Sequence, residues 1–126
     1  MAVTHPPAVR DGICNFVVDQ LDEGTPPGKL VFQTSADAEV ATLTLANPAF
    51  SAAAGGIAVA GAILEDPDAT GGIIAKARLR NAAGVDKITC SVTAKGGGGD
   101  IELDGGVSVR MGQQVALLDL IYSAPA

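Results

Sequence analysis

The chain has 126 residues, 48% of them hydrophobic, and a formal net charge of −6. A net negative charge repels phosphate backbones, so we expect no nucleic-acid partner. The length suits one domain, and 16 glycines with only 3% aromatic residues favour short strands joined by turns. We therefore expect a single β-sandwich domain over residues 1–126, with an N-terminal helix and linker over 1–28 and a β-rich body over 29–126.

The first predicted element is an amphipathic helix near the N-terminus. Its apolar stripe consists of Val9, Ile13, Phe16, Val17 and Leu21, which recur at spacings of three and four. Gly24 and the Pro-Pro-Gly that follows are expected to end the helix. Such a helix would cover an open end of a β-sandwich or contact a neighbouring subunit. For the second role, Val9, Ile13 and Phe16 are candidate interface residues.

From residue 29 onward the hydrophobic pattern alternates, which is typical of strands. The predicted strands cover residues 29–34, 40–46, 57–63, 72–80, 86–94, 101–103, 107–109 and 115–122. Their spacing of roughly ten residues predicts a mainly β fold. We expect an antiparallel β-sandwich or jelly-roll-like barrel of seven or eight short strands, with one N-terminal helix.

The clearest strand pattern lies in residues 72–80, before a predicted hairpin loop at 81–84. Ile73, Ala75, Ala77 and Leu79 are predicted to face one way, and Ile74, Lys76, Arg78 and Arg80 the other. We call Lys76, Arg78 and Arg80 the basic stripe. It is either an ordinary solvated sheet face or a subunit interface that contacts an acidic patch on a neighbour.

Residues with catalytic or cofactor-binding chemistry are sparse. His5 is the only histidine, so neither a His-based metal cluster within the chain nor a Ser-His-Asp triad is predicted. The run Gly96–Gly99 is followed by Asp100 and a strand pattern, whereas a phosphate loop needs a Lys-Ser/Thr pair and a helix. We expect a flexible loop there. We also expect no enzyme activity, no catalytic residue and no cofactor.

Two acidic clusters are candidate calcium ligands. They comprise Glu65, Asp66 and Asp68, and Asp100, Glu102 and Asp104. Neither cluster has EF-hand spacing, so we expect solvated surfaces and no metal, with calcium as the alternative. Cys14 and Cys90 are expected to be reduced and buried. Their spacing alone leaves a disulfide open.

No segment has the pattern of a signal peptide or a membrane span. The longest apolar-looking stretch, residues 49–64, is mostly Ala and Gly and is too short and weakly hydrophobic to cross a bilayer. We therefore expect no membrane partner, and a protein that is made and used in a cytoplasm or assembled there into something larger.

Several stretches resemble small structural proteins of tailed bacteriophages. They are residues 30–37 (LVFQTSAD), 40–50 (VATLTLANPAF), 96–103 and the ending 119–126 (DLIYSAPA). The resemblance spans most of the chain and departs at residues 62–68, where the relatives are richer in Ser and Thr. It implies a virion component that is assembled in the host cytoplasm, and more narrowly a capsid-decoration or cement protein on the capsid surface. The implied partners are the major capsid protein and copies of the chain itself, expected as a trimer. The resemblance assigns no functional residue.

Three alternatives stay open. A tail or head–tail connector protein would share the structural role but would form a ring or tube at one vertex. A host-surface or carbohydrate-binding module is disfavoured by the shortage of aromatic side chains. A small hydrolase is disfavoured because no nucleophile–base pair is evident.

Overall fold

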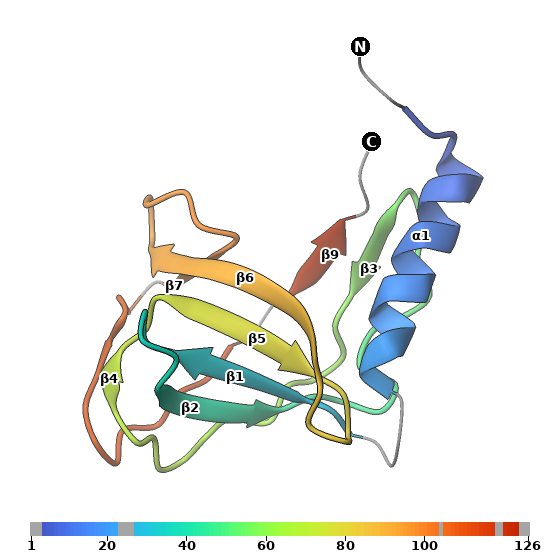
Figure 1. Cartoon of the computed structure of the whole chain (residues 1–126). Helices are drawn as coiled ribbons and strands as arrows, with labels where there is room; N and C mark the ends of the chain where they lie inside the picture. Colours follow the sequence, from blue (N-terminus) through green and yellow to red (C-terminus); the bar gives the residue numbers. More distant parts are fainter. Residues whose placement is uncertain (1–3, 23–26, 104, 118–119, 124–126) are drawn as a thin grey trace.

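The computed structural model describes residues 4–22, 27–103, 105–117 and 120–123. In these ranges the chain is mainly β, with one α-helix, a curled five-stranded sheet and two smaller sheets (Figure 1). The predicted β-sandwich-like class with an N-terminal helix is confirmed. The described residues form nine short strands, one more than the upper end of the prediction.

The N-terminal helix, α1, spans Pro7–Asp19, and a 3₁₀ turn over Gln20–Asp22 continues it. Proline stands at the first helical position, where its missing amide proton costs no helical hydrogen bond. No helix in the described ranges is long and apolar enough to cross a membrane.

The helix buries a different stripe from the predicted one. Cys14, Val18 and Leu21 are buried, whereas Val9 and Phe16 are exposed. Periodicity alone fits both stripes, because apolar residues at spacings of three and four occur on two sides of this helix. Of the predicted stripe, only Leu21 is fully buried, so the stripe as a whole does not cover the sheet, which was one of the two roles expected for it.

The main sheet has the strand order β2-β1-β5-β6-β7. Its strands are β1 (Lys29–Gln33), β2 (Glu39–Thr44), β5 (Lys76–Arg80), β6 (Asp86–Ala94) and β7 (Ile101–Leu103). The first four pair antiparallel, as predicted, but β7 runs parallel to β6. This parallel pair corrects the wholly antiparallel prediction. The glycine-rich segment between the two strands makes it possible, since Gly96 and Gly98 adopt φ values of +88° and +81° that favour glycine.

One face of the main sheet carries the core and the other is polar. Leu30, Phe32, Leu43, Ala77 and Leu79 lie on the core face and are almost completely buried. The basic stripe of β5 lies on the opposite face, as predicted, because side chains alternate along a strand.

The predicted strand at 72–80 is two strands, β4 (Gly72–Ile73) and β5. The break between them reverses the expected orientation: Ile74 is buried and Ile73 is 65% exposed. Gly71 and Gly72, at the start of β4, have φ values of +93° and +135°, so the chain also bends where it enters the predicted strand.

A second layer closes over the core face. It contains β4 paired with β8 (Ser108–Val109), together with isolated bridges that join Thr44 to Leu64 and Asp66 to Val115. The predicted last strand at 115–122 is interrupted, because Val115 forms only a bridge and β9 spans Ile121–Ser123. Residues 118 and 119 lie outside the described ranges.

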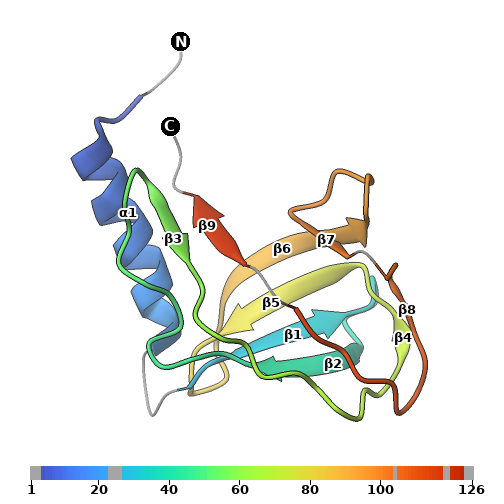
Figure 2. The ribbon, with the colours of Figure 1, turned by 180° about the vertical axis from the view of Figure 1, so that it is seen from behind.

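The remaining elements form a unit that we call the arm. It consists of α1, β3 (Ile57–Val59) and β9, which pairs antiparallel with β3. Both views show these three elements together at one side of the main sheet (Figure 1 and Figure 2). Ala58 and Tyr122 are cross-strand partners, and Cys14 of α1 donates its thiol proton to the Tyr122 carbonyl, with 3.6 Å between Sγ and O.

Candidate interaction surfaces

Polar side chains of the helical segment bind backbone amides of the Ala- and Gly-rich segment 49–56. The amides of Ala49, Ala53 and Gly56 donate to Asp22 Oδ1 (2.9 Å), Asn15 Oδ1 (2.8 Å) and Asp11 Oδ1 (2.6 Å), respectively. We call these three bonds the helix clamp. They fix the rotation of α1 about its own axis. These contacts therefore determine which side of the helix faces away from β3 and β9.

Of the candidate interface residues, Val9 and Phe16 lie on that outward side, and Ile13 lies beside them and packs partly against the core. We call the three residues the outer α1 stripe. Phe16 is 70% exposed, Val9 is 45% exposed and Ile13 is partly buried. At 3.6 residues per turn, Phe16 lies nearly opposite the buried Cys14 and Val18. The helix is therefore apolar on two opposite sides, and the described part of the chain covers only one of them.

Each member of the basic stripe is paired within the chain. Lys76 forms a hydrogen-bonded ion pair with Asp37, and Arg78 Nη2 lies 3.4 Å from the same carboxylate. On the other side, Arg78 Nη1 lies 3.3 Å from Asp86 Oδ2 and Arg80 Nε lies 2.6 Å from Asp86 Oδ1. The hydrogen bond from Lys76 holds the pKa of the Asp37 carboxyl below its ordinary value.

Arg78 is further fixed because its Nε donates to Gln33 Oε1 at 2.8 Å, and Gln33 is almost fully buried. Three cations thus share two carboxylates within the chain. An acidic partner would compete with Asp37 and Asp86, so the stripe is a weaker attractor than three unpaired cations would be.

The glycine loop is bound by the chain's own side chains. Gly98 donates its amide to Glu102 Oε2 at 2.9 Å, Gly96 donates to Glu102 Oε1 at 3.4 Å, and Gly99 donates to Thr93 Oγ1 at 3.1 Å. Backbone amides of this kind would otherwise attract a phosphate. The Glu102 carboxylate accepts these hydrogen bonds in place of a phosphate and would repel a second anion. This is a structural reason to expect no phosphate at the glycine loop.

The acidic clusters also bind backbone. Asp66 Oδ2 accepts the Thr42 amide and Asp100 Oδ2 accepts the Ser91 amide, each at 2.9 Å. Within the ranges that the structure describes, no group of three His, Cys, Asp or Glu side chains could hold a metal ion. Asp104 lies outside those ranges.

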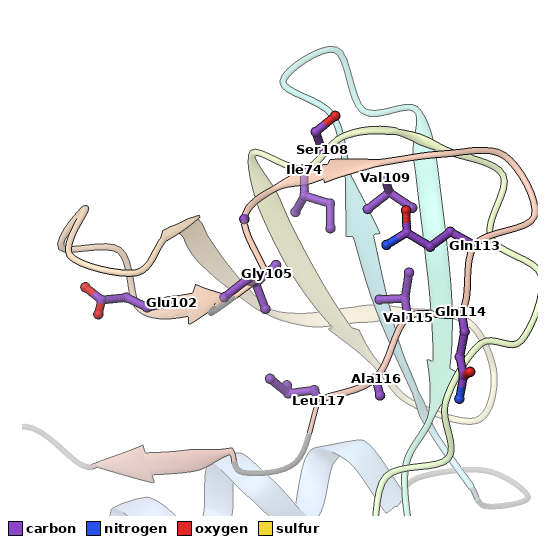
Figure 3. A pocket seen from close by; sticks show the side chains of 12 residues that line it. Ile74, Glu102, Gly105, Ser108, Val109, Gln113, Gln114, Val115, Ala116 and Leu117 are labelled. Atoms are coloured by element: carbon purple, nitrogen blue, oxygen red, sulfur yellow. The ribbon is translucent and has the colours of Figure 1, made fainter.

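A hollow of about 510 Å³ lies between the β7 edge of the main sheet and segment 105–117 (Figure 3). Ile74, Val109 and Val115 supply its apolar wall, and Glu102 and Gln113 are among its polar lining residues. Its described lining contains no aromatic side chain and one titratable group, Glu102. The hollow therefore offers no ring for stacking a sugar and no paired acid and base.

Both cysteines are free, as predicted, but only Cys14 is fully buried and Cys90 is half-buried. Burial raises the pKa of both thiols, which makes them poor nucleophiles at neutral pH. The candidate His5 lies on the segment just before α1.

Sequence reasoning missed two features, the helix clamp and the exposed face of the β3–β9 sheet. The spacing of Asp11 and Asn15 places two acceptors on one helix edge, which was a usable signal. Their partners are amides of a segment whose own side chains carry no recognisable pattern, and no local rule identifies them.

No known family model, curated protein or solved structure matches this chain. The resemblance to phage structural proteins stays a prediction.

Proposed function

We propose that this chain is a non-enzymatic structural subunit that packs against other protein subunits through the outer α1 stripe. The observation that carries the proposal is the exposure of Phe16 and Val9 on a helix whose orientation the helix clamp fixes. Burying one phenylalanine side chain contributes about 1.5–3 kcal/mol. Many symmetric copies would turn this modest contribution into stable attachment, because bound copies act together.

The finer proposal is a capsid-decoration protein of a tailed-phage virion that binds the major capsid protein at the capsid surface. Its support is the resemblance of residues 30–50 and 119–126, together with an arm that presents an apolar surface outward. The hollow beside β7 gives no support to the alternative of a carbohydrate-binding module, because no aromatic ring lines it.

The test is an add-back experiment on purified particles that lack the chain. Phe16→Asp should lower the occupancy at a limiting protein concentration at least about tenfold, which corresponds to about 1.4 kcal/mol. Met111→Asp is the matched control, because Met111 is an apolar residue that is 86% exposed and lies outside the arm. Equal occupancy for the wild type and Phe16→Asp would exclude the outer α1 stripe as the attachment surface.

The basic stripe supplies a second arm of the same experiment. If it is an interface, Lys76→Glu combined with Arg78→Glu should also reduce occupancy, whereas unchanged occupancy would reject that role. A map of the decorated particle separates the capsid assignment from a connector, since a decoration protein forms a lattice over the shell and a connector forms a ring at one vertex.

A further inference from the structure

We propose that an extended segment of a partner protein, apolar on one side and basic on the other, adds to the outer edge of β7 and fills the hollow beside it. The inference rests on the proposed structural role and names a second surface with its own occupant. That surface does not include the outer α1 stripe: β8, which borders the hollow, lies at the end of the fold opposite to α1 (Figure 2).

The hollow lies where the two layers of the fold are not joined by a strand. Among the residues that the structure describes, β7 is the last strand of the main sheet, and only β6 pairs with it. The hollow of about 510 Å³ separates this edge from segment 105–117 of the second layer. A cavity of ~150 Å³ holds one benzene ring, so the hollow has room for about two or three apolar side chains.

The inner wall of the hollow is apolar. Ile74, Val109 and Val115 point into it (Figure 3) and are themselves only 2%, 9% and 8% exposed. Leu103 and Leu117 line it as well and pack partly against the core. A side chain that enters the hollow therefore contacts the apolar core of the sandwich, and an apolar one is favoured there.

The backbone of β7 can bond to such a segment. The Lys95 amide donates to the Leu103 carbonyl at 3.2 Å, so Leu103 faces β6. Alternation then turns the amide and the carbonyl of Glu102 away from β6, toward the outer edge. A segment that pairs with Glu102 extends the main sheet by one strand. Its side chains alternate between the hollow and the polar face of the sheet.

The charge at this edge favours basic side chains on the polar side of the segment. Asp100 and Glu102 alternate with the buried Ile101, so they lie on the polar face. Both also line a smaller hollow of about 210 Å³ that shares Glu102 and Leu117 with the first. No lysine or arginine is among the described residues that line either hollow.

Both carboxylates keep the capacity to bind a cation. Each accepts hydrogen bonds from backbone amides of its own chain, but a carboxylate has about four acceptor positions. Cross-strand pairs of opposite charge stabilise a sheet. The chain itself carries a net charge of −6, so an acidic edge favours a basic partner over a second copy.

One oriented polar group faces the hollow from the second layer. Gln113 Oε1 accepts the Arg110 amide at 3.0 Å, which fixes the side-chain amide. Its Nε2 then points into the hollow, as Figure 3 shows, and can donate to a carbonyl of the incoming segment.

An NMR titration of the isolated protein with three capped hexapeptides tests the proposal. The peptides alternate valine with lysine, valine with glutamate, or serine with lysine. The valine–lysine peptide should shift the amide signals of Glu102, Gly106 and Leu117. It should bind at least about tenfold more tightly than either of the others, because only it is apolar on one side and basic on the other.

Three results of the titration would overturn the proposal. One is the absence of shifts at these amides up to millimolar peptide. Another is equal affinity for the serine–lysine peptide, which would mean that charge alone attracts it. The third is the same shifts on raising the protein concentration without peptide, which would assign the edge to a second copy.

Ala116→Lys gives a matched test from the side of the protein. Ala116 is an exposed residue that lines the hollow, so a lysine there is tolerable and would repel the valine–lysine peptide. Its affinity should fall at least about tenfold, whereas Ala83→Lys, which adds the same charge in the exposed 81–84 loop, should change it less than twofold. Circular dichroism checks that both variants are folded. Equal effects of the two variants would contradict the proposal. Neither readout involves Phe16, so the add-back experiment still judges the proposed function separately.

Discussion

At the scale of single residues, two phenylalanines lie in opposite environments, and substituting each one shows whether it belongs to the core. Phe32 is fully buried on the core face of β1, and Phe16 is 70% exposed on α1. We expect Phe32→Ala to lower the free energy of unfolding by about 3–5 kcal/mol, because the change leaves a cavity in a packed interior. Urea denaturation of the isolated protein measures the loss.

Phe16→Ala is the matched control, because the same atoms are removed from the same kind of side chain. It should change the free energy of unfolding by no more than about 0.5 kcal/mol at a concentration where the protein is monomeric. A loss comparable to that of Phe32→Ala would mean that Phe16 belongs to the core and would remove the basis of the outer α1 stripe.

At the scale of elements, the helix clamp makes the position of α1 depend on side chains rather than on apolar packing alone. Asn15→Ala removes the acceptor of the Ala53 amide and leaves a partly buried donor without its bond. We expect a loss of about 1–3 kcal/mol in stability. Amide exchange in residues 49–56 should accelerate as the segment detaches from the helix.

Asp19→Ala is the control for the helix clamp, since Asp19 is an exposed residue of the same helix. Its effect on stability should stay within about 0.5 kcal/mol and should leave exchange in 49–56 unchanged. If Asn15→Ala behaved in the same way, α1 would be held by its apolar contacts and the clamp would have no energetic role.

The elements predicted well from the sequence are those whose hydrophobic pattern allows only one face to be buried. The strand at 86–94 has the predicted bounds, with Ile88, Cys90 and Val92 on the inner side, and the loop after Arg80 forms the predicted hairpin. Alternation determines such elements because a one-residue slip would bury the charged face.

The elements predicted poorly have hydrophobic patterns that allow either of two faces to be buried. α1 carries two apolar stripes, and local spacing does not say which one meets the rest of the chain. β3 alternates correctly, but its larger side chains face outward and Ala58 faces α1. Both choices are set by distant contacts, the helix clamp and the pairing of β3 with β9. The same tertiary contacts turn Val9 and Phe16 outward, which is compatible with the second of the two roles expected for their stripe, an interface with a neighbouring subunit.

At the scale of the whole molecule, the basic stripe and the exposed apolar surfaces lie on different parts of the fold. The basic stripe and its carboxylate partners lie on the polar face of the main sheet, while the arm presents the outer α1 stripe and the face of Ile57, Val59 and Ile121. Removing apolar surface from water lowers the free energy. The arm is therefore the part of the molecule most favoured to enter an interface. A subunit that packs against its neighbours through such surfaces would link them.

Such links predict a mechanical effect if the chain is a capsid-decoration protein. Particles without it should assemble, because their own contacts form the shell, but should release DNA at a lower temperature than decorated particles. The physical reason is that each bound copy adds buried area between shell subunits that internal pressure strains. Dye-detected DNA release during heating measures the effect. Add-back of the wild type should restore the release temperature and Phe16→Asp should not. Equal release temperatures for bare and decorated particles would contradict the stabilising role.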